Sequence, residues 1–357
     1  MKLYASSYKH TLNFKFDAGT SRGVLKSRAT YYIKLALVSD FSTFGVGEAS
    51  PLDGLSIDHI PTFGLEVQKI IDEINGKWTI EMLKADLTDV KWERLPALKF
   101  ALETALMDLE NGGKRMLFQN KFAEGSAKIP INGLVWMGDQ TFMKHQIAQK
   151  LDAGFTTLKM KVGAIDFESE KSLLAGIRKN FSIQELTLRV DANGAFTPEN
   201  ALQKLDELAK YDLHSIEQPI AVNQWEEMRT LCQKSPIPIA LDEELIGLYQ
   251  SKQTEMLDFI EPQFLIFKPT LLGGLAVTNQ WIEHCEDRNI PWWMTSALES
   301  NIGLNAIAQY AADKEVLMPQ GLGTGQLYHN NIPSPLTVAK GNIFIDKAQK
   351  WDLSLID

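Results

Sequence analysis

The spacing of hydrophobic and polar positions changes partway along the chain. Within residues 1–125, aromatic and β-branched residues predict strands over 2–16 and 29–38, and apolar positions three and four apart predict helices over 61–75 and 93–111. The glycines and the proline of segment 45–52 are expected to end the strand region. Strands followed by helices are typical of an α+β domain, which we assign to residues 1–125.

From residue 126 to residue 325, short apolar segments alternate with helical ones. The predicted strands span residues 130–136, 158–162, 186–191, 214–217, 237–242, 264–268 and 291–295, with a weak last strand near 315–319. Such alternation predicts a parallel sheet, and so many consecutive units favour a (β/α) barrel over a doubly wound open sheet, which stays an alternative. The segment 326–357 holds proline turns and a strand-like stretch at 341–346, and we expect it to return to the first domain.

Ionisable residues stand at the ends of consecutive predicted strands. In a barrel these positions converge on the mouth, where reactions take place. Two lysines lie two residues apart and share one face of their strand, because side chains alternate across a strand. The later strands end in a charged group at intervals of 25 or 26 residues. The set is Lys159, Lys161, Asp191, Glu217, Asp242 and Lys268.

The three carboxylates of this set predict a metal site. Asp191, Glu217 and Asp242 each follow an apolar strand, which distinguishes them from scattered surface acids. Carboxylates brought together repel one another unless a cation neutralises them. An all-oxygen ligand set suits Mg²⁺ or Mn²⁺, and Mg²⁺ keeps positions open for substrate oxygens. We therefore expect magnesium here, with manganese as the alternative.

The lysines indicate the reaction. Lys161 and Lys268 would flank the metal, and a lysine beside a divalent cation and another ammonium loses its proton more readily. A neutral lysine can act as a general base, and Lys159 would keep Lys161 deprotonated. Together these groups predict proton abstraction next to a carboxylate, with the metal stabilising the enediolate. A Schiff-base lysine is the competing use, but it does not need three carboxylates.

Four further residues are candidates for substrate contacts. Arg22 stands in a flexible loop and could contact an anionic ligand, and Asn193 lies beside a metal-ligand position. The segment 296–301, which contains Ser296 and Glu299, opens a helix after a strand. Its amides and the serine hydroxyl are suited to a carboxylate, although helix capping explains the same residues equally well.

The composition indicates the kind of ligand. A net charge of −9 and a pI near 5.3 argue against nucleic acid or an anionic membrane surface as a partner, and favour a small anionic carboxylate held by a metal and lysines. The two cysteines form no metal-binding pattern and predict buried thiols in a reducing compartment. Residues 1–7 lack the apolar core of a signal peptide, and no stretch has the roughly 18 apolar residues of a membrane span. We expect a cytoplasmic protein, and the sequence leaves a homo-oligomer open.

Taken in order, these motifs resemble those of the enolase superfamily, in particular its muconate-lactonizing subgroup. The resemblance extends over nearly the whole chain and is carried by Lys159-Met160-Lys161, Val190-Asp191-Ala192-Asn193, Ile216-Glu217-Gln218-Pro219, Leu241-Asp242-Glu243 and Lys268-Pro269. It implies a (β/α)₇β barrel under an α+β capping domain. It also implies Asp191, Glu217 and Asp242 as Mg²⁺ ligands, with Lys161 and Lys268 as the acid–base pair.

Within the subgroup, the segments 47–56 and 296–304 most resemble the o-succinylbenzoate synthase family of menaquinone biosynthesis. That family eliminates water from 2-succinyl-6-hydroxy-2,4-cyclohexadiene-1-carboxylate. The resemblance implies that Lys161 takes the α-proton and returns it to the departing hydroxyl, while Lys268 stabilises the enediolate from the opposite face.

Other members of the superfamily share this catalytic set. Dipeptide epimerases and N-succinylamino acid racemases use the same two lysines and stay as alternatives, and a muconate cycloisomerase is a further one. Dipeptide epimerases typically carry an Asp-x-Asp after the last strand, whereas segment 319–325 of this chain contains no acid. A non-catalytic relative would be expected to lack Lys161 or a metal ligand, and all are present.

Overall fold

The computed structural model describes residues 1–20, 23–163, 165–316 and 318–356. Its first sheet is antiparallel and consists of β1 (Leu3–Thr20), β2 (Gly23–Leu37) and β3 (Asp40–Ala49), with β2 in the middle. The two strands predicted from the sequence are present and longer than predicted. The third strand covers residues where the sequence predicted the end of the strand region.

Three helices follow this sheet: α1 (Phe63–Ile74), α2 (Ile80–Asp86) and α3 (Pro96–Glu110). The predicted helices correspond to α1 and α3, whereas α2 was missed because it has only seven residues. Helix α3 packs directly on β3. A Cβ atom on Gly45 would lie 1.9 Å from the Ala105 carbonyl oxygen, and one on Gly47 would lie 1.9 Å from that of Ala101. Glycine is therefore required for this close approach.

The second part of the chain is built on a seven-stranded sheet in which all the strand pairs are parallel. The sheet order follows the chain order, from one edge to the other. The strands are β5 (Gly133–Val135), β6 (Thr157–Lys161), β7 (Thr187–Asp191), β8 (Ser215–Glu217), β9 (Ile239–Leu241), β10 (Phe264–Phe267) and β11 (Trp292–Met294). This confirms the predicted βα alternation and the α/β class.

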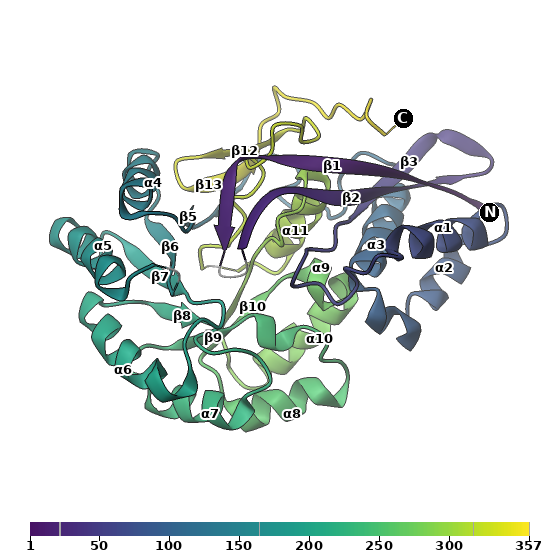
Figure 1. Ribbon diagram of the computed structural model, residues 1–357. Coiled ribbons are helices and arrows are strands. Elements are labelled where there is room, and N and C mark those ends of the chain that lie inside the picture. The colour runs from purple at the N-terminus through teal and green to yellow at the C-terminus, as the bar shows by residue number, and fades with distance from the viewer. Residues whose placement is uncertain (21–22, 164, 317, 357) are drawn as a thin grey trace.

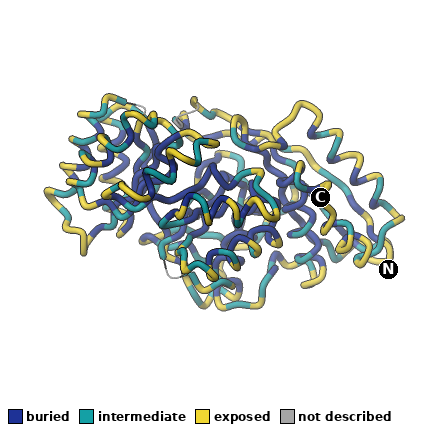
Figure 2. Tube along the Cα trace, turned by 90° about the horizontal axis from the view of Figure 1, so that it is seen from below, coloured by how far each residue is buried: buried dark blue, intermediate teal, exposed yellow. Residues whose placement is uncertain are grey.

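Helices alternate with these strands and lie on the outside of the curved sheet (Figure 1). They are α4 (Gln140–Asp152), α5 (Phe167–Asn180), α6 (Pro198–Leu208), α7 (Trp225–Lys234), α8 (Ser251–Ile260), α9 (Pro269–Leu272), α10 (Gly274–Glu286) and α11 (Asn301–Asp313). Three short 3₁₀ helices cover Val90–Arg94, Ala209–Tyr211 and Glu243–Leu245. The apolar strands and the inner faces of the helices form the main core, and buried residues run through the interior of the second part (Figure 2).

The two edges of the parallel sheet are joined through residues 320 and 321. Gln320 forms a parallel bridge with Ile131, just before β5, and Gly321 forms one with Thr295, just after β11. The weak strand predicted near 315–319 is not found there among the described residues. Instead, the two residues that follow it, Gln320 and Gly321, form one β-bridge each.

The tail pairs with the second part as well as packing on the first. β12 (Leu336–Ala339) and β13 (Asn342–Ile345) form a hairpin whose β13 pairs with β4 (Lys128–Pro130), so the stretch 341–346 lies beside the start of the parallel sheet. Residues before and after the hairpin contact the first sheet. Tyr328 forms a bridge with Phe14, and Ile356 packs in a cluster with Tyr32.

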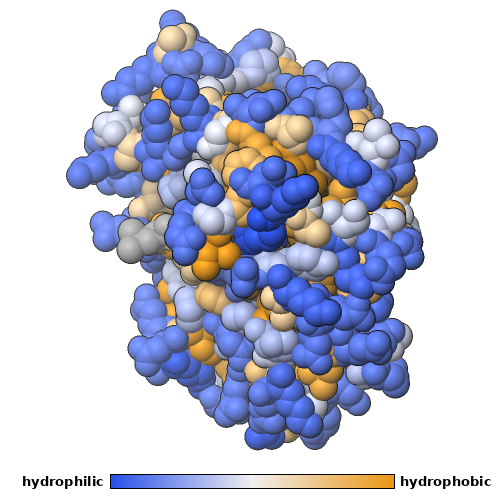
Figure 3. All heavy atoms as spheres, turned by 90° about the vertical axis from the view of Figure 1, so that its left-hand side faces the viewer, coloured by the Kyte–Doolittle hydropathy of each residue, from blue (hydrophilic) through white to orange (hydrophobic). Residues whose placement is uncertain are grey.

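The surface is charged and polar over most of the face that carries α4 and α5, with apolar side chains gathered near its upper centre (Figure 3). Cys232 and Cys285 are buried and unpaired, and burial raises the pKa of each thiol to about 12. In the described ranges, none of the helices has the length and apolar character needed to cross a membrane.

Candidate active site

Strand register brings the charged groups together at the carboxyl edge of the parallel sheet. Lys161 pairs with Asp191 across β6 and β7, and Asp191 pairs with Glu217 across β7 and β8. Asp242 directly follows β9, and Lys268 directly follows β10. Residues that are 25 or 26 positions apart in the sequence therefore lie side by side.

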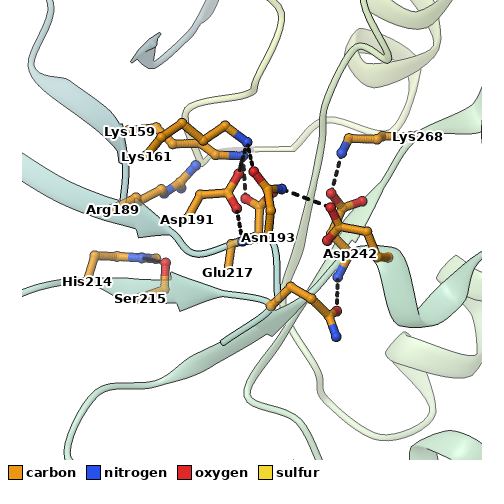
Figure 4. A network of polar contacts seen from close by, with 12 residues as sticks. Lys159, Lys161, Arg189, Asp191, Asn193, His214, Ser215, Glu217, Asp242 and Lys268 are labelled. Atoms are coloured by element: carbon orange, nitrogen blue, oxygen red, sulfur yellow. Dashed lines mark hydrogen bonds and ion pairs between the residues drawn. The ribbon is translucent and has the colours of Figure 1, made fainter. Parts of the chain in front are cut away.

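Direct ion pairs connect these side chains (Figure 4). The ammonium of Lys161 lies 2.5 Å from Asp191 Oδ2 and donates to Asn193 Oδ1 at 2.6 Å. The ammonium of Lys159 lies 2.8 Å from the same Asp191 oxygen and also pairs with Glu217. Lys268 pairs with Asp242 on the far side of the cluster. All of the residues that the sequence placed at the catalytic centre thus meet in one network.

The carboxylates differ in their electrostatic surroundings. Burial raises the pKa of Glu217 well above its ordinary value, and the neighbouring charge of Asp191 raises it further. Burial also acts to raise the pKa of Asp191, but the facing charges of Lys159 and Lys161 outweigh it and leave that pKa well below the ordinary value. The opposite shifts follow from position, because Asp191 faces two ammonium groups whereas Glu217 is buried beside the charge of Asp191.

The lysine environments follow from the same network. Burial acts to lower the pKa of Lys159, but Asp191, Glu217 and Asp242 outweigh it, so the pKa lies above its ordinary value. The pKa of Lys268 also lies above its ordinary value, because the charge of Asp242 and nearby carboxylates outweighs the effect of burial. Lys159 is therefore a charged residue between two carboxylates.

The three carboxylates fit a hard divalent cation by their chemistry. Asp191, Glu217 and Asp242 are buried and offer only oxygen donors, and Glu217 Oε1 is buried with no hydrogen-bond partner in the described part of the chain. Within that part, no three Asp, Glu, His or Cys side chains stand close enough together to hold an ion as they are. The reason is that Lys159 lies between Asp191 and Glu217 and Lys268 pairs with Asp242.

Amide side chains hold the carboxylate network from outside. Asn193 accepts from Lys161 and donates to Glu243 Oε1 at 2.8 Å, with a φ of 44°. Gln218 has a φ of 39° and accepts from the backbone amide of Glu244 at 3.2 Å. Left-handed backbone at non-glycine residues is uncommon and is tolerated best by short polar side chains such as Asn. Asn193 thus lies beside Asp191 and connects Lys161 with Glu243.

A cavity of about 260 Å³ opens over the lysines. Its floor includes Lys159, Lys161 and Lys268, and Asn193 also faces it. The first part of the chain contributes residues 23–25 and 52–55 to the wall, and Leu134 and Trp136 add apolar surface. A pocket with apolar walls and a few convergent polar groups is the usual form of a small-molecule site.

The residues predicted to contact substrate have different positions. Ser296 lines the cavity and accepts a hydrogen bond from Thr324 Oγ1 at 2.7 Å. Glu299 lies behind it, fully buried, and accepts from Ser296 Oγ and Thr270 Oγ1 at 2.5 Å each. Burial raises the pKa of Glu299, and its contacts make it a support for Ser296. Arg22 lies outside the described residues.

Backbone amides in and just after the 296–301 segment do bind a carboxylate, but this carboxylate is a side chain of the protein itself. Glu48 of β3 accepts from Ser300 N at 2.8 Å, Ser300 Oγ at 2.6 Å and Gly303 N at 2.8 Å. It is fully buried at the start of α11, where helix amides favour negative charge. The sequence reasoning missed this role, although Glu48 lies within the 47–56 segment that carries part of the family resemblance.

Arg28 is a second connection that the sequence reasoning missed. It is buried in β2 and donates from Nη1 to the carbonyl oxygens of Ala297 at 2.5 Å and Leu298 at 2.8 Å, and from Nη2 to that of Ser50. Leu298 has a φ of 67°, a strained value for a branched residue, which these bonds help to hold. The sequence contains no pattern that marks Arg28 as buried.

Comparisons with known proteins place the chain among similar sequences and folds. The model of the family described as "Enolase C-terminal domain-like" matches residues 143–349. An o-succinylbenzoate synthase from Desulfotalea psychrophila (strain LSv54 / DSM 12343) is 48% identical over 94% of this chain and 97% of its own length.

Solved structures have the same fold. MenC from Desulfotalea psychrophila LSv54 matches with a TM-score of 0.85 and 45% identity, covering 97% of this chain and 100% of its own. A dipeptide epimerase from Cytophaga hutchinsonii, in complex with Mg and the dipeptide D-Ala-L-Val, matches with a TM-score of 0.83 and 19% identity over 96% and 93% of the two chains. The second match supports the fold alone.

Proposed function

The chain belongs to the enolase C-terminal domain-like family, and we propose that it is an enzyme that forms o-succinylbenzoate. It would do so by eliminating water from 2-succinyl-6-hydroxy-2,4-cyclohexadiene-1-carboxylate, a step of menaquinone biosynthesis, in the cytoplasm. The observation that carries this proposal is the 48% identity to an o-succinylbenzoate synthase over nearly the full length of both chains. The three lysines on the cavity floor, each paired with at least one carboxylate, support the same chemistry.

The architecture that we propose is a (β/α)₇β barrel with a capping domain. The bridges of Gln320 and Gly321 to the two edges of the parallel sheet support closure of the barrel. We keep the proposed divisions at residues 1–125 for the capping domain, 126–325 for the barrel and 326–357 for the final segment. The capping domain would serve to cover the cavity, since residues 23–25 and 52–55 form part of its wall.

The metal that this family chemistry implies would be held by Asp191, Glu217 and Asp242. The buried oxygen donors and the unpartnered Glu217 Oε1 support Mg²⁺, with Mn²⁺ as the alternative. When bound, the ion would supply positive charge against the negative charge that develops on the substrate carboxylate.

The side chains of the chain itself would move the proton. Lys161 Nζ reaches the cavity and would take the proton from the carbon beside the substrate carboxylate, then give it to the departing hydroxyl. Asn193 holds Lys161 Nζ in place by its 2.6 Å hydrogen bond. Lys159 is charged and lies between two carboxylates, and its positive charge would disfavour the protonated form of Lys161. Lys268 would stabilise the developing negative charge from the opposite face.

Substrate turnover tests this proposal. We expect the purified protein to convert the cyclohexadiene substrate in the presence of Mg²⁺, followed by its ultraviolet absorbance, and to stop when EDTA removes the metal. Absence of turnover together with racemisation of N-succinyl amino acids would replace the proposal with a racemase. Epimerisation of a dipeptide without dehydration would replace it with an epimerase.

A further inference from the structure

Two buried polar atoms on the cavity wall have no hydrogen-bond partner among the described residues. They are Asn132 Oδ1 and Thr295 Oγ1. Both residues line the cavity that contains the lysines, and their exposed fractions are only 4% and 9%. Buried polar groups are almost always hydrogen-bonded, and leaving one unpaired costs about 1–3 kcal/mol. These two atoms therefore call for a partner from outside the chain.

The two residues lie on either side of Gly321, Asn132 just before β5 and Thr295 just after β11, at the two edges of the parallel sheet. Asn132 N donates to Gln320 O at 2.9 Å, which sets Asn132 on one side of the 320–321 segment. Gly321 bridges with Thr295 on the other side, and its own amide donates to Met294 O at 2.7 Å. The parallel alignment places Asn132 and Thr295 on either side of Gly321.

Gly321 lies directly against the side chain of Thr295 and leaves no room for a side chain of its own. A Cβ atom at this position would lie 2.4 Å from Thr295 Oγ1 and 2.8 Å from Thr295 Cγ2. The backbone of Gly321 does not have the positive φ that reserves a position for glycine, so the constraint is space. Any side chain at this position would displace Thr295 Oγ1 from its place beside the Gly321 backbone.

The chemistry of the two atoms selects the ligand. An amide oxygen only accepts, so the partner of Asn132 Oδ1 must donate a hydrogen. A ketone or a carboxylate has no hydrogen to donate. An ammonium would meet repulsion from Lys159, Lys161 and Lys268, which line the same cavity. A hydroxyl group can donate to Asn132 and accept from the hydroxyl of Thr295.

We propose that Asn132 and Thr295, the latter held in place by its close contact with Gly321, form a subsite for the hydroxyl group that leaves the substrate. This inference rests on the proposed dehydration. In that step the carbon–hydrogen bond beside the carboxylate breaks and its proton passes to Lys161 Nζ. The carbon–oxygen bond then breaks, the oxygen takes the proton from Lys161, and water departs without any oxidation or reduction. The subsite holds this oxygen as hydroxyl and receives it as water.

The comparison of substrate with product tests the subsite, because o-succinylbenzoate lacks the ring hydroxyl. The change is Thr295→Val, which keeps the shape and removes the hydroxyl. We expect kcat/KM to fall about tenfold, the equivalent of one hydrogen bond, while the inhibition constant of o-succinylbenzoate stays within twofold of the wild-type value. Asn132→Leu is expected to show the same split.

Two glycine variants provide a matched pair. Gly321→Ala would displace the Thr295 side chain and is expected to lower kcat/KM by tenfold or more. Gly176→Ala is the control, because Gly176 lies in α5, does not line the cavity, and an added Cβ would meet no described atom within 4 Å. We expect Gly176→Ala to behave as the wild type. If Gly321→Ala does not fold, Thr295→Val still decides the matter.

Two results would overturn the subsite. One is unchanged kcat/KM in both Thr295→Val and Asn132→Leu. The other is an equal loss of substrate and product affinity, which would indicate a permanently bound water at these atoms. Failure of the proposed function is distinct from either, since the wild-type protein itself would then show no dehydration.

Discussion

The three lysines at the cavity floor differ in what surrounds them, and this difference supports the separate tasks that we propose for them. Lys159 is paired with two carboxylates, Lys268 with one, and Lys161 shares an oxygen of Asp191 while it also bonds an amide. A charged group that is fixed by carboxylates serves as an electrostatic partner. Lys161, which is held partly by a neutral amide, is the one suited to exchange a proton with a ligand.

Substitution of Lys268 distinguishes two roles for this residue, electrostatic stabilisation by its positive charge and proton transfer as a base. If Lys268 acts by its positive charge, Lys268→Met should lower kcat by about 10²–10³-fold, as expected when one preorganised stabilising group is removed. Lys268→Arg keeps the charge and should retain a larger share of the activity. Steady-state kinetics of the two variants provide the comparison. Equal loss in both variants would show that proton transfer by Lys268 is required.

Buried Asp58 gives a prediction for the pH dependence of stability. Burial raises its pKa to about 7, although its Oδ2 accepts from Ala97 N at 2.8 Å. The folded state therefore holds a proton that the unfolded state releases near its ordinary pKa. Stability from this group is present at low pH and is lost as the pH rises towards 7.

Asp58→Asn removes this titration. Each pKa unit corresponds to about 1.4 kcal/mol, so the free energy of unfolding of the variant relative to the wild type should rise by about 2–3 kcal/mol between pH 5 and pH 8. Urea unfolding of both proteins at the two pH values measures the difference. A constant difference would mean that Asp58 is ionised in the folded protein throughout.

At the scale of secondary-structure elements, two carboxylates of the first part cap helices of the second. Glu48 of β3 caps α11 and Glu103 of α3 accepts from Leu275 N at 2.7 Å, at the start of α10. The α11 cap lies beside the cavity loop that carries Ser296, whereas neither Glu103 nor α10 lines the cavity. The two contacts are therefore a matched pair with different distances from the site.

Glu48→Gln and Glu103→Gln separate structural support from positioning. Each substitution replaces a carboxylate oxygen, which accepts hydrogen bonds, by an NH₂ group that would face backbone N–H donors. The lost hydrogen bond should lower the free energy of unfolding by about 1–3 kcal/mol. Glu48→Gln should also raise KM several-fold, because the 296–300 loop loses its anchor. Thermal unfolding and steady-state kinetics measure both effects. Unchanged KM in Glu48→Gln, or an equal change in Glu103→Gln, would contradict the positioning role.

The elements that the sequence did not reveal have physical reasons. β3 contains Gly45 and Gly47, which read as a break, yet these glycines are what lets α3 approach the strand. Gln320 and Gly321 form only one β-bridge each, so this segment is too short to show the alternating pattern that predicts a strand. Helix α2 has seven residues, and so carries barely two turns of pattern. In contrast, the repeated strands with charged ends were predictable because local sequence alone sets both features.

For the whole molecule, metal binding should be coupled to stability. An ion that binds the folded protein alone stabilises it by mass action, by about 2.7 kcal/mol at a hundred times the dissociation constant. Mg²⁺ should therefore raise the temperature of unfolding relative to EDTA. The variant Glu217→Gln, with a weakened ligand set, should show a smaller increase. An equal increase in the variant would place the ion elsewhere.

The site joins residues from distant parts of the chain, and this limited what the sequence could reveal. Motifs within one strand predicted the lysines and carboxylates. The anchors Arg28 and Glu48 act over more than 250 positions, on residues 297 to 303, and no local pattern marks such partners. The wall of the cavity likewise combines residues 23–25 and 52–55 with residues after β11.

We propose that Lys161 carries the proton in the dehydration that forms o-succinylbenzoate. The direct test of this role is the rate of product formation by the wild type and by Lys161→Ala, side by side in saturating Mg²⁺, with circular dichroism to confirm folding. We predict rapid product formation by the wild type and a loss of about 10²–10⁴-fold in the folded variant, the usual contribution of a general base. Equal rates in the two proteins would contradict the role of Lys161, and no product from the wild type would contradict the dehydration itself.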